Sequence, residues 1–333
     1  MIKHPETIPS SQGLQVEGFK IKRTIDQAAN ILVITHQKPD GDGLGALSAV
    51  AYYLSTSGKK HQLFCLDPVP LQYSFLPFIH QVTSDPEVFK QQFDLLIVLD
   101  SGDLEYAGVA QVLAVYPYPY TLINIDHHAT NRGYGQINLV LAGASSVSEI
   151  IYHLFRSWHL AISKEVATAL LNGIIFDTGS FSNAATSLSA LEAASHLLNL
   201  GARHKQINEN FLRNKSLGLL KLWGRAFQRL TYNGRYDLAF TVVTQKDIED
   251  CQVPAETVEG LANFLNELAG AKVVLVLREA AGGLIKGSFR TTTDDVDVGR
   301  LAQIWGGGGH QKAAGFSLKG KIVYNNHKWS VVD

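Results

Sequence analysis

Residues 30–58, NILVITHQKPDGDGLGALSAVAYYLSTSG, decide how the chain is expected to fold. The run NILVITH (30–36) is apolar almost throughout, which is typical of a strand buried on both faces. The segment GLGALSAVAYYLSTSG (43–58) then has the length and composition of a helix that ends at Gly58. A strand of this kind leading into a helix is the first half of a parallel βαβ unit. The stretch therefore predicts a parallel sheet, with a polar turn at the carboxyl end of its first strand.

Three more apolar runs repeat this pattern and predict the strands HQLFCLD (61–67), DLLIVLD (94–100) and YTLINID (120–126). The segment DPEVFKQQF (85–93) is expected to be a short helix, because Asp85 and Pro86 form a good cap and first-turn pair. Two longer amphipathic helices are expected at SVSEIIYHLFRSWHL (146–160) and SKEVATALLNGIIFD (163–177). Alternation of strands with helices predicts an α/β domain with helices on both faces of its sheet.

The chain has 333 residues, more than one hydrophobic core usually serves, so two domains are expected. Residues 1–18 look like a loose leader, and the parallel-sheet domain is predicted at 19–200. A helical linker follows at 201–228, and a smaller α/β domain at 229–333. That second domain contains the predicted strands YDLAFTVVT, AKVVLVLRE and LIKGSFRTT, the helix TVEGLANFLNELAG, and a glycine-rich segment near residue 306.

Composition narrows the class of protein. Hydrophobic residues make up 46% of the chain and charged residues 18%, and the net charge is −1. A protein that binds long nucleic acid along its backbone normally has a positive excess, so no long nucleic acid partner is expected. The N-terminal segment lacks the apolar core of a signal peptide, and no apolar stretch is membrane-length, so a cytoplasmic protein is expected. Cys65 and Cys251 lie far apart and are expected to be buried free thiols.

Side chains that can bind metal ions gather at the carboxyl ends of the predicted strands, where ligands bind in open parallel sheets. The candidates are His36, Asp40 and Asp42 after the first strand, Asp100 after the third, Asp126, His127 and His128 after the fourth, and Asp177 at the end of the apolar segment LLNGIIFD. Each of them alone has an ordinary reading as a turn former, a helix cap or a surface histidine. Their recurrence at several strand ends favours a metal site.

Histidine with several carboxylates and no thiolate is typical of Mn²⁺ or Mg²⁺ rather than of a thiolate zinc site. The set is larger than a single ion needs. It suits two ions about 3.5–4 Å apart, the arrangement used for in-line displacement at phosphorus. Asp100, on a central strand, is the best candidate for a carboxylate that bridges them, and a hydroxide held between the ions would be the nucleophile.

The segment GGGGH (306–310) follows a predicted helix, so it is not the strand–turn–helix fingerprint of dinucleotide binding. Glycines let backbone N–H groups approach an anion closely, which predicts a phosphate-binding nest. A flexible hinge is the alternative.

Four segments resemble the ordered motifs of the DHH phosphoesterase superfamily: HQKPDGDGLG (36–45), VLDSGD (98–103), IDHHATN (125–131) and GIIFDTGSF (173–181). The segment GGGGHQKAAGF (306–316) resembles the characteristic loop of the DHH-associated domain found in the RecJ-like and nanoRNase branches. The resemblance covers about residues 20–320. Gly43 and Ala46 depart mildly from the first motif, which puts one hydroxyl contact in doubt but not the metal ligands.

The resemblance implies a role for each candidate residue. One metal would be held by His36, Asp40 and Asp100, and the other by Asp42, Asp100, His127 and Asp177. Asp126 would orient its neighbours, and His128 would contact the scissile phosphate or assist the leaving oxygen, two roles that stay open. The substrate would be bound by Arg290, by Thr291 in place of the usual serine, and by Gly306, Gly307, Gly308, Gly309 and His310.

Within the superfamily, the predicted architecture most resembles the stand-alone nanoRNase and pAp phosphatase group. That resemblance implies hydrolysis of short oligoribonucleotides to mononucleotides and of 3′-phosphoadenosine 5′-phosphate (pAp) to AMP. It also implies two divalent ions, Mn²⁺ before Mg²⁺, and a homodimer. The alternatives are a linear or cyclic dinucleotide phosphodiesterase, a RecJ-like single-strand exonuclease, and a nucleotide-binding module without catalytic activity.

Overall fold

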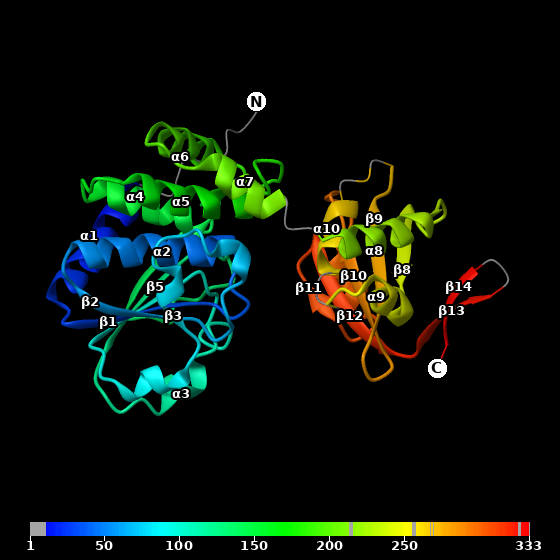
Figure 1. Cartoon of the computed structure of the whole chain (residues 1–333), viewed down its shortest axis with the longest axis horizontal. Helices are drawn as coiled ribbons and strands as arrows, with labels where there is room; N and C mark the ends of the chain where they lie inside the picture. The colour runs from blue at the N-terminus through cyan, green and yellow to red at the C-terminus, as the bar shows by residue number, and fades with distance from the viewer. Residues whose placement is uncertain are drawn as a thin grey trace. The chain divides into compact units, whose positions relative to one another are not determined.

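The computed structural model describes residues 11–212, 216–254, 258–266, 268, 270–325 and 328–332. It divides into two compact units, residues 1–214 and 215–333, whose helices and strands are labelled in Figure 1. No helix within these described ranges is both long and apolar enough to cross a membrane.

The N-terminal unit is built on a six-stranded sheet in which every neighbouring pair is parallel. Its strand order is β3 (Val82–Thr83), β2 (Lys60–Phe64), β1 (Asn30–Thr35), β4 (Leu95–Leu99), β5 (Thr121–Asp126) and β6 (Ile137–Val140). Strands β2 and β3 follow β1 toward one edge of the sheet, and β5 and β6 follow β4 toward the opposite edge. The sheet therefore reverses between β1 and β4, which is the place where open α/β sheets bind ligands.

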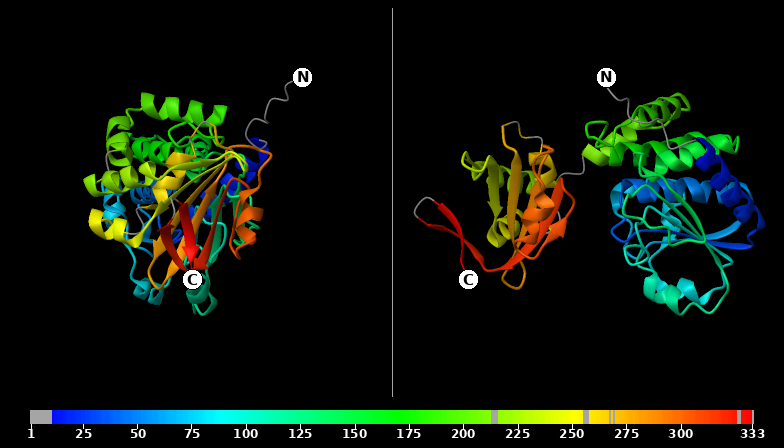
Figure 2. Two further views of the ribbon diagram at one scale, coloured as in Figure 1. Left: turned by 90° about the vertical axis from the view of Figure 1, so that its right-hand side faces the viewer. Right: turned by 180° about the vertical axis from the view of Figure 1, so that it is seen from behind.

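Helices cover both faces of this sheet, as predicted, but unequally. Alternate residues of β1 and β4 enter two separate cores, because successive strand residues point to opposite faces. One core joins the sheet to α1 (Ser11–Gln27), α2 (Gly41–Thr56), α4 (Val147–Ser157), α5 (Lys164–Asp177) and α6 (Leu188–Asn199). The other is closed by the short helices η3 (Pro86–Lys90) and α3 (Ala110–Ala114), and Figures 1 and 2 show the cyan α3 on the side of the sheet away from α2.

The start of helix α1 and the presence of strands β3 and β6 differ from the sequence prediction. Helix α1 begins at Ser11, within the segment expected to be a loose leader, because Leu14, Ile21 and Ile25 pack against the core. Strands β3 and β6 were not predicted, since the segments are too short or too mixed in polarity to show a strand pattern. The short 3₁₀ helices η1 (Leu71–Tyr73) and η2 (Ile79–Gln81) and the helix α7 (His204–Leu212) complete the unit.

The C-terminal unit has a second six-stranded sheet, in which only β8 and β9 are parallel neighbours. Its order is β11 (Gly308–Gly309), β12 (Ala313–Lys319), β10 (Leu284–Arg290), β9 (Val273–Ala280), β8 (Leu238–Val243) and β7 (Thr231–Asn233). Helices α8 (Leu217–Gln228), α9 (Gln245–Cys251) and α10 (Glu259–Leu265) pack on one face, and α11 (Val298–Gln303) on the other. A hairpin of β13 (Lys321–Asn325) and β14 (Lys328–Val332) follows.

The fold class predicted from the sequence is confirmed: a parallel α/β unit followed by a smaller α/β unit. The helix α8, which the sequence placed in a linker, buries Leu222, Trp223 and Ala226 in the core of the C-terminal unit. Both cysteines are buried and free, as expected.

Candidate metal centre

The turn after β1 holds His36 and Asp40 in fixed orientations. Asp40 caps α2, and its Oδ1 accepts hydrogen bonds from the backbone N–H groups of Asp42 at 3.0 Å and Gly43 at 3.1 Å. The Nδ1 atom of His36 lies 2.7 Å from the carbonyl oxygen of Gln37, so this nitrogen carries the proton and donates it. The other ring nitrogen, Nε2, then faces Asp40 Oδ1 at 3.6 Å and Asp100 Oδ2 at 3.5 Å. A histidine oriented in this way by a carbonyl group is prepared to bind a metal ion.

Asp100 lies at the centre of the cluster, directly after β4. Its backbone has φ of +59°, in the left-handed region that non-glycine residues seldom occupy. The conformation is held by the buried setting and by its N–H, which donates to the carbonyl of Ile125 at 3.1 Å. Its Oδ1 faces His127 Nε2 at 3.6 Å, but within the described part of the chain this buried oxygen has no hydrogen-bond partner. Strained backbone of this kind gathers at functional sites, where the surrounding structure holds it in place.

Asp42, His127 and Asp177 form the second group of ligand atoms. Asp42 is fully buried, and its two oxygens accept the backbone N–H groups of Val147 at 2.6 Å and Ser148 at 2.8 Å, at the positive end of α4. His127 Nε2 lies 3.3 Å from Asp177 Oδ2, and its Nδ1 faces a carbonyl oxygen at 3.4 Å. Asp177 is the last residue of α5.

The structure thus brings together all six side chains that the sequence proposed as metal ligands. The ligand atoms of His36, Asp40 and Asp100 lie within 4.8 Å of one another. Those of Asp42, His127 and Asp177 form another such group, and Asp100 lies beside both because it also groups with His127 and His128. Two groups of Asp and His side chains that could hold metal ions therefore lie next to each other, and Asp100 of the first group faces His127 of the second.

The buried carboxylates of this cluster are close enough that bound cations would stabilise their charged forms. Burial, together with the charges of Asp42, Asp100 and Asp40, raises the pKa of Asp177 to about 10. Burial also raises the pKa of Asp42 and of Asp100 to about 6, with neighbouring carboxylates adding to the effect. Four carboxylates this close cannot all ionise unless positive charge is supplied, and the unpartnered Oδ1 of Asp100 offers a ligand atom for it. Oxygen and imidazole nitrogen donors fit a divalent ion such as Mn²⁺ or Mg²⁺.

Asp126 and His128 are joined by a short hydrogen bond beside the cluster. Asp126 Oδ1 lies 2.7 Å from His128 Nδ1 and accepts the backbone N–H of His127 at 2.8 Å. Its Oδ2 accepts from Asn131 Nδ2 at 2.7 Å. Asp126 is fully buried, whereas the His128 side chain is 42% exposed. The hydrogen bond to Asp126 raises the pKa of His128, so this imidazole carries its proton more readily and presents Nε2–H to solvent.

Sequence reasoning missed two side chains that hold this geometry. Asn131 joins Asp126 to Asn124 and to the backbone after β4. Tyr106 stacks on His36 with ring centroids 5.0 Å apart. Asn131 stands in the quoted segment IDHHATN, close to the ligand-bearing residues, and that position was the available signal. Nothing comparable marks Tyr106, which reaches the site through a loop.

Two glycines leave space that the centre needs. A Cβ atom on Gly43 would lie 2.4 Å from Thr35 Oγ1 and 3.0 Å from His36 Nε2. A Cβ atom on Gly173 would lie 2.0 Å from Ser148 Oγ and 2.4 Å from Asp42 Oδ1. Helices α2 and α5 can therefore approach the ligand atoms only because these positions lack a side chain.

In the C-terminal unit, the candidate substrate-binding residues lie at one end of β10. Arg290 is the last residue of β10, and its Nε donates to Asn263 Oδ1 at 2.9 Å. Thr291 is buried, and its hydroxyl donates to the carbonyl of Lys272 at 2.6 Å. The side chain that the sequence placed against substrate therefore already has an internal partner.

The glycine-rich segment differs in detail from its predicted form. Gly308 and Gly309 form strand β11 and pair with Gly315 and Ala314 of β12. The backbone N–H groups of Gly306, Gly307 and His310 donate to the carbonyls of Gln303, Ala302 and Ala313. The prediction of an open N–H nest is therefore wrong at these three positions, because antiparallel pairing and the end of α11 already engage them. Glycine is still required at 309, where φ is +146° and a Cβ atom would lie 2.5 Å from Ala313 O.

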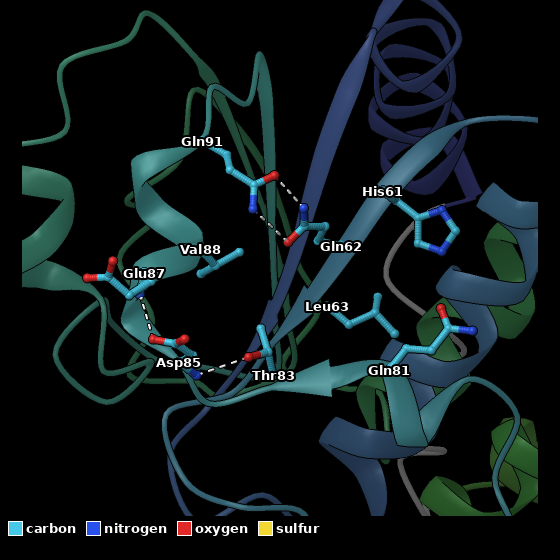
Figure 3. A pocket seen from close by; sticks show the side chains of 9 residues that line it. All are labelled: His61, Gln62, Leu63, Gln81, Thr83, Asp85, Glu87, Val88 and Gln91. Atoms are coloured by element: carbon cyan, nitrogen blue, oxygen red, sulfur yellow. Dashed lines mark hydrogen bonds between the residues drawn. The ribbon is translucent and has the colours of Figure 1, made fainter.

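A separate hollow of about 360 Å³ lies at the β2–β3 edge of the N-terminal sheet, where Figure 3 shows the reciprocal amide pair of Gln62 and Gln91. Its lining residues include none of the ligand candidates. The centre is therefore identified by its converging side chains, not by the shape of this hollow.

Comparison with known proteins agrees with this interpretation of the chain. Residues 30–174 match the model of the DHH family, N-terminal domain, and residues 239–327 match the DHHA1 domain. The bifunctional oligoribonuclease and PAP phosphatase NrnA of Thermus thermophilus is 29% identical over 290 residues, which are 87% of this chain and 84% of the relative. The protein of the same name from Bacillus subtilis is 28% identical over 304 residues, which cover 89% and 91%.

Among solved structures, an exopolyphosphatase-related protein from Bacteroides fragilis is similar in fold, with a TM-score of 0.83 and 22% identity. The match covers 94% of this chain and 92% of that protein, so both units take part in the likeness.

Proposed function

Because the chain belongs to the DHH family of phosphoesterases and carries both a DHH domain and a DHHA1 domain, we propose that it hydrolyses short oligoribonucleotides to mononucleotides and pAp to AMP. The observation that carries the proposal is the pair of neighbouring ligand groups, in which Asp100 of one faces His127 of the other. Relatives of similar length bear the name of this bifunctional activity, which favours these substrates over others that the same metal chemistry could serve.

In this proposal His36, Asp40 and Asp100 hold one divalent ion, and Asp42, Asp100, His127 and Asp177 hold the other. Mn²⁺ is the first candidate and Mg²⁺ the second, because the donors are carboxylates and imidazoles without a thiolate. Ions bound there supply Lewis-acid chemistry, which polarises the phosphoryl group and lowers the pKa of water. The protein's part is to fix the donors: Gln37 O orients His36, and the N-terminus of α4 orients Asp42.

His128 is proposed to contact the phosphate that is attacked. Its Nδ1 is engaged with Asp126, so only Nε2–H is free to donate to a phosphate oxygen or to the leaving oxygen. Asp126 favours the charged imidazole and holds the plane of the ring. A positive donor in this place would stabilise the negative charge that develops on the substrate.

The C-terminal unit is proposed to bind the rest of the substrate. Arg290 offers a guanidinium suited to a phosphate group, and its Nε contact with Asn263 orients the fork. Thr291, Gly306, Gly307, Gly308, Gly309 and His310 stay proposed as substrate-binding residues. Of these, His310 has an exposed side chain that could reach a ligand.

Product analysis tests the function directly. The full chain is incubated with Mn²⁺ and, separately, a five-nucleotide RNA, pApA, pAp, a long single-stranded DNA and pyrophosphate. Conversion of the short RNA to mononucleotides and of pAp to AMP, with the DNA and pyrophosphate intact, is the expected result. Preferred degradation of the long DNA would contradict the proposed substrate class, and no turnover of any compound would favour a module that only binds nucleotides.

Asp100→Asn separates the metal hypothesis from the substrate hypothesis. The substitution keeps the size of the side chain but removes the charge next to both ligand groups, so turnover of every substrate should be lost. Asp26→Asn is a matched control, because the Asp26 side chain forms an exposed pair with Lys22 on α1. Near-normal turnover by Asp100→Asn would rule out a carboxylate shared by two ions.

A further inference from the structure

One face of the C-terminal sheet is covered over only part of its width. Helices α8, α9 and α10 pack on this face against Val274 and Val276 of β9. On the opposite face, α11 packs against Phe289 of β10 and Phe316 of β12. Strands β12 and β11 therefore extend beyond the helices on the first face, as does the part of β10 before Arg290, where α10 contacts the strand through Asn263; Figure 1 shows these strands at one side of the sheet. Lys286, Gly315 and Ser317 are exposed there.

The uncovered face carries a row of cations and no acidic residue. Alternate residues of a strand share a face, and the β10–β12 register pairs Lys286 with Ser317, Ser288 with Gly315 and Arg290 with Ala313. Leu284 and Lys319 complete the face as the last pair. We call Lys286, Arg290 and Lys319 the cationic row. The eight positions on this face are Leu284, Lys286, Ser288, Arg290, Ala313, Gly315, Ser317 and Lys319.

A shallow hollow of about 380 Å³ lies over this surface. Lys286, Ser288, Gly315 and Ser317 line it, together with Gly306 and Gly307 at the start of the glycine-rich segment. Its size falls in the range of small-molecule sites. The floor is made of small side chains, so a polar chain could lie close to the sheet while lysine and hydroxyl groups contact it from the sides.

The spacing along β10 fits a nucleotide chain. Alternate residues of an antiparallel strand lie about 7 Å apart, which places the backbone positions of Lys286 and Arg290 about 14 Å apart with Ser288 between them. Consecutive phosphates of an extended single strand are separated by about the distance between alternate strand residues, so Lys286, Ser288 and Arg290 can each face one phosphate. Donors that repeat with the phosphates can bind the backbone whatever the base sequence, as in proteins that bind single strands without sequence preference.

We propose that the cationic row binds the phosphodiester backbone of nucleotides beyond the one that is hydrolysed. The inference rests on the proposed function and deepens it. It makes the C-terminal unit the part of the protein that distinguishes an oligoribonucleotide from pAp. A pAp molecule carries its phosphates on a single nucleotide, so one bound at Arg290 would leave the far end of the row at Lys319 unoccupied, whereas an RNA of several nucleotides spans the row.

Binding and hydrolysis are measured separately so that the two hypotheses can fail separately. Calorimetric titration of the full chain in EDTA, where no substrate is consumed, gives affinities for a five-nucleotide RNA and for pAp. The variants are Lys286→Gln and Lys319→Gln. The matched control is Lys246→Gln, which removes the same charge from an exposed position on α9. Hydrolysis of both compounds by the unaltered protein with Mn²⁺ is the second measurement.

The unaltered protein should bind the RNA more tightly than pAp. Each row variant should weaken RNA binding about three- to tenfold, the effect of removing one ordinary solvent-exposed hydrogen bond, and leave pAp binding unchanged. The salt dependence of RNA binding should fall by about 0.7 in log–log slope for each phosphate that a row lysine no longer neutralises. Lys246→Gln should match the unaltered protein.

Three results would overturn the proposal: equal affinity for RNA and pAp, RNA binding unaffected by both row variants, or equal losses of affinity for RNA and pAp. If the row behaves as expected but neither compound is hydrolysed, the proposed function fails and the binding surface stands. If both compounds are hydrolysed and the variants have no effect, the function stands and the row is not a binding surface.

Discussion

Asn131→Ala is expected to destabilise the side chains that support the metal centre, without removing any proposed ligand. Asn131 Nδ2 donates to Asp126 Oδ2 at 2.7 Å and shares its second proton between Asn124 Oδ1 and the carbonyl of Ser101, each at 3.1 Å. Its Oδ1 accepts from Asn124 Nδ2 at 3.0 Å and from the backbone N–H of Gly133 at 2.8 Å. Asp126 and Asn124 are both fully buried, so neither can turn to water when these bonds are removed.

The magnitude follows from the groups left without partners. A buried polar group that loses its hydrogen bond costs about 1–3 kcal/mol, and a charged group costs more. The Asp126 Oδ2 atom and the Asn124 amide are affected, and partial relaxation of the structure reduces the total cost. The free energy of unfolding should therefore fall by about 2–4 kcal/mol. For a unit of this size, that corresponds to a fall in Tm of about 5–15 °C. Turnover should also fall, because Asp126 would hold the His128 ring less firmly.

Thermal unfolding followed by circular dichroism gives the stability, and initial rates of pAp hydrolysis give the turnover. Asn199→Ala, at the exposed end of α6, is the control and should change neither quantity. Bound metal, measured after dialysis, should stay near the unaltered level because every ligand is kept. The reasoning would be refuted if Asn131→Ala unfolded within about 2 °C of the unaltered protein, or if it lost stability but kept its full rate.

Three further substitutions probe other parts of the molecule. Gly43→Ala should displace His36 and reduce metal content and turnover. The control is Gly224→Ala, where a Cβ atom meets nothing within 4 Å, and it should be neutral or slightly stabilising. Equal effects of the two substitutions on metal content would contradict the steric argument. Arg290→Ala should weaken substrate binding and leave metal content intact, and a fall in metal content would show that the arginine serves the centre. Burial opposes the ionisation of Asp247, but hydrogen bonds from arginine and threonine outweigh the effect of burial and lower the pKa of this carboxyl. The charged Asp247 therefore stabilises the fold above the ordinary carboxyl pKa, and this stabilisation is lost in acid. Urea unfolding of Asp247→Asn should therefore show lower stability at pH 7 and a smaller loss between about pH 5 and pH 2; an unchanged pH profile would refute the linkage.

The central strands and the cluster could be predicted from the sequence because each depends on a strong local pattern. DLLIVLD (94–100) can hardly be anything other than a buried strand, and the acid that ends it lies where ligands bind. Polar residues at several strand ends then reinforce one another. This is why the six proposed ligands could be chosen together, and the structure brings their side chains into contact range.

The features that were missed depend on contacts between distant segments. The β3 strand has only two residues, Val82 and Thr83, and exists because β2 offers an edge to pair with. The first turns of α1 look polar in isolation and are helical because their few apolar residues reach the core. The N–H groups of the glycine-rich segment are engaged by β12 and α11, which no local pattern shows. The stacking of Tyr106 on His36 is likewise a product of the loop path.

The order of the ligand-bearing residues along the chain has a consequence for biosynthesis. They begin at His36 and end at Asp177, and Asp42 is oriented by the first turn of α4, which is made long after it. A ribosome that has produced only the first half of the N-terminal unit has therefore made most of the donors but cannot yet arrange them. Only when α5 emerges does the second group gain its last carboxylate. If both groups bind metal as proposed, a divalent ion would be captured only after α4 and α5 have docked. The time at which a nascent chain first retains such an ion would then report the completion of this unit's folding.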